Sequence, residues 1–315
     1  MIKGIHHITA ISGDPQKNLE FYSGFLGLRF VKKTVNFDDP YTYHLYYGNE
    51  TGDPGTIITF FPWGENALKG RKGNGMVTTI SYSAPLAGLD FWLKRFAESN
   101  KEYHGPFNRF GDEVIIFEDH DGIENEICFT SDDQRKGWDN GFIPEEYSIR
   151  GFSGATLTIS DRIGTEDLMI NHLGFSRKDE TANRFRYKSG EGGPGTFIDL
   201  LIYPDSPHGR MGVSAVHHIA FRAENDDVQL TLRKRLSTNG LSVTPVINRN
   251  YFKSIYFREP GNVLFEIATD PPGFMIDESL EGLGVELKLP EWYENMRGNI
   301  ENRLPALKAP ALSRK

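Results

Sequence analysis

The stretch GIHHITAISGDPQKNLEFYSGFLGLRF, residues 4–30, predicts a strand, a helix and a second strand in that order. The first strand, IHHITAIS, ends before Asp14, whose side chain can cap the helix that follows. Pro15 suits the first helical turn, and Gly27 can end the helix in a left-handed conformation. The apolar side chains between these residues fall on one face, which is typical of an amphipathic helix.

The same plan recurs along the chain. Two more strands complete the first unit by about residue 63, which makes it a βαβββ unit. GEGGPGTFIDLLIYPD (190–205) echoes GNETGDPGTIITFFPW (48–63), so the third unit repeats the first. The second and fourth units each end in a strand, a glycine-containing turn and a returning strand, which indicates a hairpin. We therefore predict an α+β protein with four βαβββ modules at residues 1–70, 71–148, 149–210 and 211–270, followed by a C-terminal segment at residues 271–315.

Composition limits the kinds of partner. The chain has 315 residues, more than one compact domain usually contains, and a formal net charge of −8 at pH 7. Without a Lys/Arg cluster, neither nucleic acid nor an anionic membrane is expected as the main partner. No signal core is seen, and no window approaches the ~18 apolar residues of a membrane span. Cys128 is the only cysteine, so we expect a cytoplasmic protein whose metal ligands are His and carboxylate.

Two histidine pairs and one glutamate are candidate metal ligands. The pairs at residues 6–7 and 217–218 occupy the same point of the repeat, in the first strand of a unit. Because successive strand residues face opposite sides, only one histidine of each pair can point into a barrel. Glu266 lies within the apolar strand VLFEIA, where an unpaired buried carboxylate is costly. A metal would compensate this charge directly, and the alternative is a salt bridge to an arginine.

Six sequence motifs resemble those of a known protein family: GIHHITAI, YHLYYGNETGDPGT, KGRKGN, VHHIAF, NRNYFKSIYFR and LFEIATDPPGF. Together with the repeated βαβββ plan, they resemble the vicinal-oxygen-chelate superfamily of glyoxalases and extradiol dioxygenases, and within it the hydroquinone ring-cleaving branch. The likeness extends over about residues 3–305. It implies that pairs of modules form two open barrel-like mixed sheets. It also implies that the second histidine of each pair, His7 and His218, binds the metal together with Glu266.

The function implied by this resemblance is ring cleavage. Two histidines and one carboxylate are the ligand set of non-haem Fe(II) oxygenases, and they leave positions open for substrate and O2. A para-hydroquinone is favoured over a catechol as the aromatic substrate, with extradiol-type cleavage, and Mn or Zn could occupy the Fe(II) site after purification. The second module keeps Glu126 but has no histidine in its first strand, and the third has FSGATL there. The first and fourth modules are therefore expected to form the active pair.

Five polar residues are expected around the metal and the substrate: Tyr256, His217, Arg249, His6 and Thr9. Polarity matching in the last hairpin puts Tyr256 beside the carboxylate ligand, unless the turn differs by one residue. Arg249 resembles the substrate-side arginine of the family, and a solvated loop position is the alternative. Tyr256 and His217 are candidates for proton transfer. His6 and Thr9 are candidates for orienting a ligand or binding substrate or dioxygen.

Two further segments leave alternatives open. His44 lies in the strand YTYHLYY, where a hydrogen-bonded structural role is favoured over a place near the pocket. The C-terminal segment includes a predicted helix from about residue 290 to 302. We expect this segment to cross the mouth of the active barrel, with Phe274 or Trp292 adding apolar surface. A dimer contact is the alternative, which would make the protein a homo-oligomer.

Two other functions compete with the dioxygenase. A glyoxalase-like isomerase or lyase using Ni(II), Mn(II) or Zn(II) would consume no O2. It would need a fourth protein ligand, such as Thr59, His44 or a distant carboxylate. A non-enzymatic small-molecule binding protein of the same fold is the second alternative, but a binder has no need to keep two histidine pairs and a buried glutamate.

Overall fold

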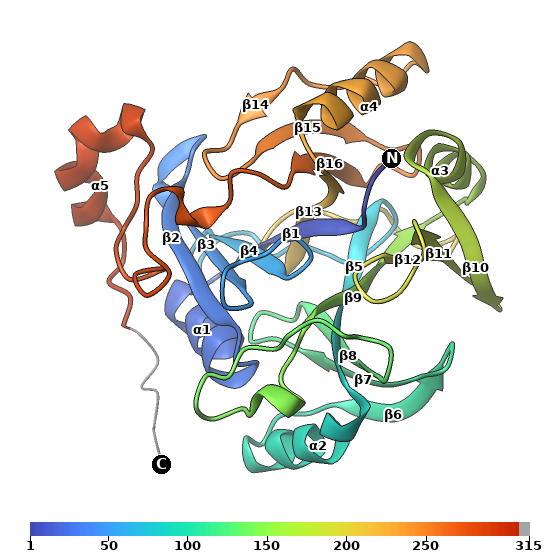
Figure 1. The fold of residues 1–315 in the computed structure, drawn as a ribbon, viewed down its shortest axis with the longest axis horizontal. Coiled ribbons are helices and arrows are strands. Elements are labelled where there is room, and N and C mark those ends of the chain that lie inside the picture. The colour runs from blue at the N-terminus through green and yellow to red at the C-terminus, as the bar shows by residue number, and fades with distance from the viewer. Residues whose placement is uncertain (309–315) are drawn as a thin grey trace.

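The computed structural model describes residues 1–308 and contains two eight-stranded mixed sheets. Their strand orders are β14-β15-β16-β13-β1-β4-β3-β2 and β10-β11-β12-β9-β5-β8-β7-β6. The first sheet combines the first and fourth modules, which lie at opposite ends of the sequence, and the second combines the second and third (Figure 1). The predicted fold class is therefore confirmed. Each sheet is curled, as expected for the half-open barrels of this plan.

The first sheet is centred on strands β1 and β13. Its strands are β1 (Ile5–Ser12), β2 (Arg29–Asn36), β3 (Asp39–Gly48), β4 (Ile57–Pro62), β13 (Ala215–Ala223), β14 (Ile247–Asn248), β15 (Lys253–Arg258) and β16 (Leu264–Thr269). β1 runs antiparallel to β13, with His7 opposite Ala220 and Thr9 opposite His218. β13 runs parallel to β16, with Ala220 beside Glu266. This register brings the first and last modules together in one continuous sheet.

The second sheet repeats this pairing. Its strands are β5 (Met76–Pro85), β6 (His104–Arg109), β7 (Asp112–Glu118), β8 (Glu124–Thr130), β9 (Gly151–Ile159), β10 (Phe175–Thr181), β11 (Arg184–Ser189) and β12 (Phe197–Ile202). Ser81 of β5 lies opposite Gly154 of β9 and beside Glu126 of β8. By register, Gly154 therefore takes the position of His7, and Thr79, two residues before Ser81, takes that of His218.

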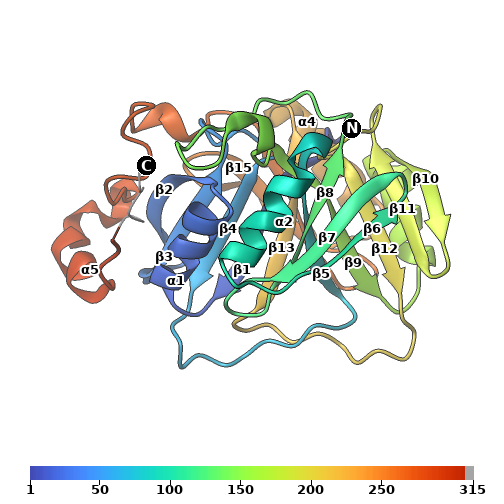
Figure 2. The ribbon, with the colours of Figure 1, turned by 90° about the horizontal axis from the view of Figure 1, so that it is seen from below.

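Helices cover the outer faces of both sheets. They are α1 (Pro15–Leu19) continued by the π-helix η1 (Glu20–Phe25), α2 (Leu89–Glu98) preceded by the short η2 (Leu86–Gly88), α3 (Ile163–Asp167) continued by the π-helix η4 (Leu168–Leu173), and α4 (Asp226–Thr238). The side chain of Asp14 accepts hydrogen bonds at the start of α1, and Gly27 has a φ of +73° after η1, as predicted. Phe25 packs on Trp92 and Phe96, so the first and second modules meet through η1 and α2 (Figure 2).

The C-terminal segment lies along β2. It contains the short 3-10 turns η5 (Phe274–Ile276) and η6 (Glu291–Met296) and the helix α5 (Arg297–Arg303); a further 3-10 turn, η3 (Glu145–Tyr147), lies between β8 and β9. Lys32 of β2 is fully buried and anchors the segment through the Asp277 carboxylate, 2.6 Å away. The backbone N–H of Lys288 donates to the carbonyl of Lys33. The segment packs against the β2–β3 hairpin (Figure 1), where the buried Phe274 ring lies 5.1 Å from the Tyr46 ring of β3.

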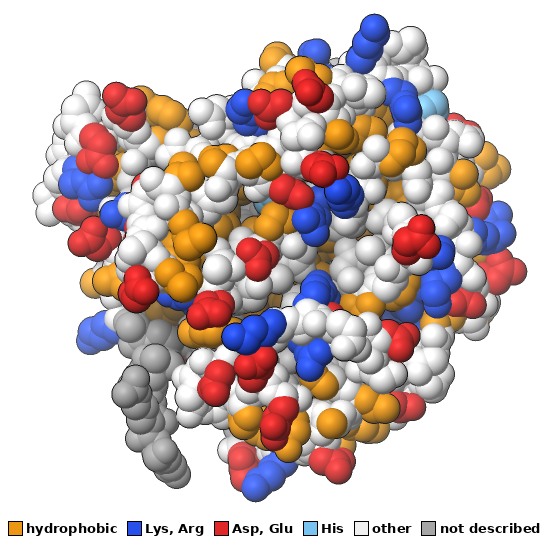
Figure 3. Space-filling model, in the orientation of Figure 1, with side chains coloured by type: hydrophobic (Ala, Val, Ile, Leu, Met, Phe, Trp, Pro, Cys, Tyr) orange, Lys and Arg blue, Asp and Glu red, His pale blue; other side chains and the backbone are white. Residues whose placement is uncertain are grey.

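The molecular surface carries charges of both signs (Figure 3). On the face shown in Figure 3, Lys and Arg side chains are interspersed with Asp and Glu, and no large region of one sign is seen. Within residues 1–308, no helix combines the length and the apolar character that crossing a membrane requires.

Candidate functional site

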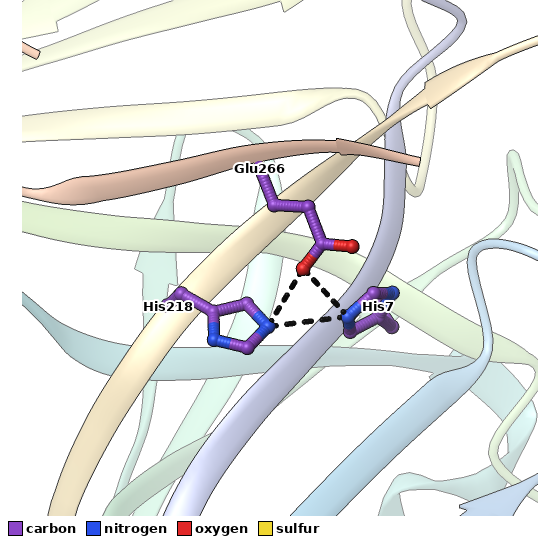
Figure 4. Close-up of side chains that lie close together, drawn as sticks. All are labelled: His7, His218 and Glu266. Carbon is purple, nitrogen blue, oxygen red and sulfur yellow. Dashed lines mark hydrogen bonds and ion pairs between the residues drawn. The ribbon is translucent and has the colours of Figure 1, made fainter. Parts of the chain in front are cut away.

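Three buried side chains converge inside the first barrel: His7 of β1, His218 of β13 and Glu266 of β16 (Figure 4). His218 Nε2 lies 2.9 Å from Glu266 Oε2. His7 Nε2 lies 3.3 Å from the same oxygen and 3.3 Å from His218 Nε2. The three expected metal ligands are therefore brought together from the two ends of the chain.

The strand register explains this convergence. His7, Ala220 and Glu266 lie in one row across three neighbouring strands, so their side chains share the inner face. His218 precedes Ala220 by two residues and points to the same side. The small side chain of Ala220 leaves room between the two flanking ligands.

The donor set fits a metal ion. Cis ligands at metal–nitrogen and metal–oxygen bonds of about 2.1 Å are about 3 Å apart, close to the separations found here. Burial alone would raise the pKa of Glu266, but His7 and His218 beside it hold that pKa well below its usual range. Burial lowers the pKa of His218. Neutral imidazoles and an ionised carboxylate are the protonation states that bind metal.

Glu266 also carries an unsatisfied oxygen. Its Oε1 accepts a hydrogen bond from the hydroxyl of Ser254, a contact that the sequence analysis did not include. Its Oε2 is fully buried and faces only the two imidazole nitrogens, and no conventional donor reaches it from elsewhere in residues 1–308. A buried carboxylate oxygen without a donor is costly, and a cation between the three side chains would remove that cost.

The neighbouring histidines fix the orientation of both imidazole ligands. Nδ1 of His6 lies 2.9 Å from Nδ1 of His7, and Nδ1 of His217 lies 2.8 Å from Nδ1 of His218. A ligand bound through Nε2 carries its proton on Nδ1, so it donates to its neighbour. His6 then holds its own proton on Nε2, which lies 3.2 Å from the Thr269 carbonyl. His6 is therefore placed behind the ligands and does not line the cavity.

A cavity of about 280 Å³ opens beside the three ligands. The described residues that line it are His7, Asn36, Phe37, Asp38, His44, Tyr46, Phe61, Trp63, His217, His218, Arg249, Phe252 and Tyr256. Aromatic rings make up much of this wall, which suits a flat aromatic ligand. His217, Tyr256 and Arg249, three of the residues expected around the metal and the substrate, line this cavity.

Tyr256 and Arg249 form one polar wall of the cavity. Tyr256 lies directly opposite Glu266 in the β15–β16 pairing, as polarity matching predicted. Arg249 Nε donates to the Tyr256 hydroxyl at 3.2 Å, and another guanidinium nitrogen lies 3.2 Å from Asp38 Oδ2. Burial raises the pKa of Tyr256, so its hydroxyl stays protonated at neutral pH.

A second polar chain lies on the other side of the cavity. His44 Nε2 is 2.8 Å from Thr59 Oγ1, and the Tyr46 hydroxyl is 2.8 Å from His44 Nδ1. Thr9 Oγ1 bonds Thr59 Oγ1 at 2.9 Å and does not line the cavity. His44 thus has the pocket position that the sequence analysis ranked second, while Thr9 lies behind it.

The second barrel has no comparable set of ligands among the described residues. Glu126 is bound by Arg109 and by the Ser81 hydroxyl, 2.6 Å away. Asp199 accepts two hydrogen bonds from Arg186, at 2.7 and 3.0 Å. The alternative considered for Glu266, a carboxylate paired with arginine, is therefore realised by the equivalent residue of the second barrel.

The family model and the related sequences that match this chain point to the same superfamily. The model of the glyoxalase/bleomycin resistance protein/dioxygenase superfamily matches residues 4–127 and 166–276. A Bacillus subtilis protein named "Putative ring-cleaving dioxygenase MhqO" is 48% identical over 301 residues, which are 96% of this chain and 95% of the relative. The Sphingobium indicum chlorohydroquinone/hydroquinone 1,2-dioxygenase is 35% identical over 307 residues, 95% of each chain.

Solved structures agree in fold. The crystal structure of a "putative dioxygenase" from Bacillus subtilis matches with a TM-score of 0.94 and 47% identity, and the match covers 98% of each chain. Glyoxalase I from Zea mays matches with a TM-score of 0.60 over 85% of this chain and 92% of that one. At 13% identity, the second match supports the fold alone.

Proposed function

The chain belongs to the glyoxalase/bleomycin resistance protein/dioxygenase superfamily and is a ring-cleaving dioxygenase, and we propose that it uses Fe(II) for extradiol-type opening of a para-hydroquinone. His7, His218 and Glu266 would hold the metal. The hydroquinone substrate is carried over from the name of the Sphingobium relative. A cytoplasmic location, where Fe(II) is kept reduced, is part of the proposal.

The observation that carries this proposal is a three-ligand site beside an aromatic cavity. Three protein ligands leave up to three coordination positions for the diol and O2. When bound, Fe(II) would supply the redox chemistry through which an electron-rich dihydroxylated ring combines with O2. The cavity volume of about 280 Å³ suits a single ring with small substituents.

We assign proton transfer to His217 and Tyr256. His217 lines the cavity and uses Nδ1 for His218, so its Nε2 is free to exchange a proton with a substrate hydroxyl. Burial lowers the pKa of His217 to about 3, which keeps the resting side chain neutral. The Tyr256 hydroxyl is the second donor on the same wall. Arg249 beside it would balance negative charge that develops on a substrate oxygen.

The polar chain on the opposite wall argues against the isomerase. The fourth ligand that a glyoxalase-like site needs was expected from Thr59, His44 or a distant carboxylate. Both nitrogens of His44 are engaged, by Thr59 and by Tyr46, and Thr59 also bonds Thr9. Within residues 1–308, neither His44 nor a further carboxylate belongs to the group of converging ligands.

The test is O2 uptake by protein reconstituted with Fe(II) under anaerobic conditions. Hydroquinone, methylhydroquinone and catechol are supplied in turn, and the loss of aromatic absorbance is followed together with O2. Uptake matched to ring loss, with hydroquinones preferred, is expected; Glu266→Ala should abolish it. No uptake by protein that is shown to contain iron would overturn the proposal and favour the isomerase.

A further inference from the structure

Arg249 is the one Lys or Arg side chain among the described residues that line the cavity. Its side chain is 20% exposed, and its guanidinium bonds the Tyr256 hydroxyl on one side. On the other side it forms an ion pair with Asp38, whose side chain is 75% exposed and also lines the cavity. The positive charge at the cavity is therefore already matched by a carboxylate of the same wall.

We propose that Asp38 is a specificity-determining residue that excludes hydroquinones with a carboxylate on the ring. This inference rests on the proposed function and adds to it the chemical class of the ring substituents. A ring carboxylate that enters the cavity would need a cation, and Arg249 is the candidate. It would then lie close to the Asp38 carboxylate, and like charges at such distances repel each other. Uncharged methyl or halogen substituents meet no such barrier.

The rest of the wall reinforces this selection. Phe37, Phe61 and Phe252 offer apolar surface, so they provide no replacement for the water that a carboxylate loses on entry. Asn36 and Trp63 can donate hydrogen bonds, but neither carries a charge. A neutral aromatic ring loses little on entering this cavity.

The turn between β2 and β3 determines the position of Asp38. In this turn the backbone N–H of Asp38 donates to the Asn36 side chain at 3.0 Å. Asp39, the first residue of β3, is also exposed, but its carboxylate bonds Tyr41 N–H and the Thr42 hydroxyl rather than Arg249. Asp39 therefore offers a matched control with the same charge change at the adjacent residue.

The experiment compares methylhydroquinone with carboxyhydroquinone in wild type, Asp38→Asn and Asp39→Asn. The quantity measured during turnover is the ratio of kcat/KM for carboxyhydroquinone to kcat/KM for methylhydroquinone. We expect Asp38→Asn to shift the ratio toward the carboxylate by roughly tenfold, and the shift to shrink at high salt. Asp39→Asn should leave the ratio as in wild type. An unchanged ratio in Asp38→Asn, or an equal shift in both variants, would overturn the inference.

Anaerobic binding separates this inference from the proposed function. Affinity of the Fe(II)-loaded proteins for both hydroquinones is measured by calorimetry without O2, so no turnover is needed. If wild type binds methylhydroquinone but consumes no O2, the proposed function fails. Tighter binding of carboxyhydroquinone by Asp38→Asn alone would still support the role of Asp38, and equal binding by all three proteins would refute it.

Discussion

Glu266 and Glu126 occupy equivalent positions in the two sheets, yet one faces two histidines and the other faces an arginine. Each lies beside the same position of the preceding parallel strand, Ala220 for Glu266 and Ser81 for Glu126. Among residues 1–308, Glu266 Oε2 has only imidazole neighbours, whereas Arg109 neutralises Glu126 directly. In the second sheet the charge of the buried Glu126 is therefore compensated by Arg109. In the first sheet no arginine of the described residues compensates Glu266, so its charge is available to bind a cation.

Replacing each carboxylate by its amide should separate these two roles. Glu266→Gln is expected to lower metal content at least tenfold, and to leave the metal-free protein as stable as wild type or more stable, because a buried charge is removed. Glu126→Gln should leave metal content unchanged but cost about 3 kcal/mol of unfolding free energy, because Arg109 loses its partner. Metal analysis measures the metal content, and denaturant unfolding of the metal-free proteins measures the unfolding free energy. Equal metal loss in the two variants would contradict the assignment.

Replacing His6 should weaken metal binding without changing substrate binding. His6 supports His7 from behind and does not line the cavity. His6→Phe is therefore expected to weaken Fe(II) affinity about tenfold, with an unchanged KM once the metal is saturating. His217→Phe removes the equivalent support from His218, and it should also lower kcat because His217 lines the cavity. Metal titration combined with steady-state kinetics distinguishes the two. A changed KM in metal-saturated His6→Phe would refute this division.

The candidate metal ligands could be picked out from the sequence because their signals are local. Histidine pairs recur at the same point of a repeated unit, and Glu266 is charged within an apolar strand. The position of Tyr256 opposite Glu266 could be inferred from the alternation of apolar and polar residues along the hairpin. These inferences rest on strand periodicity and the repeat, which are set by neighbouring residues, whereas the choice of the second histidine in each pair came from the family resemblance.

The remaining cavity residues depend on how the sheet curls. Asp38 lies in a turn that reads as a solvated connection, and only the packing of the β2–β3 hairpin near β14 brings it to Arg249. Thr9 was expected to reach a ligand or dioxygen, because it lies two residues beyond His7. It bonds Thr59 of β4 instead, since the parallel β1–β4 pairing places the two hydroxyls side by side. Such contacts between distant strands have no signature in the sequence of either strand.

The metal-free protein should lose stability as pH falls below 6.5. Burial lowers the pKa of His217 to about 3, so between pH 6.5 and about 3 the unfolded chain binds a proton that the folded chain does not. The unfolding free energy therefore decreases as pH falls through this window, by up to about 2 kcal/mol at pH 5 from this residue. Denaturant unfolding at pH 7 and pH 5 measures it. His217→Gln should reduce this pH dependence by that amount, and an identical dependence in both proteins would exclude His217 as its source.

The C-terminal segment should influence substrate binding through Phe37. The Tyr293 hydroxyl donates to the Phe37 carbonyl at 3.0 Å, and the Trp292 ring packs on Phe37 with centroids 5.6 Å apart. Phe37 lines the cavity, so Tyr293 and Trp292 contact the cavity wall through this residue, while Phe274 packs separately on the cavity-lining Tyr46.

Tyr293→Phe is therefore expected to raise the KM for methylhydroquinone roughly threefold to tenfold, the value of one hydrogen bond, with a smaller change in kcat. Trp292→Ala should act in the same direction, and the double variant should exceed neither single effect by much, because both hold the same residue. Met275→Ala, an exposed side chain of the same segment, serves as control. If KM rose equally in Met275→Ala, or if metal content fell in Tyr293→Phe, the segment would act through general stability. A KM effect confined to Tyr293 and Trp292 requires instead that the position of Phe37 controls how the ring is held.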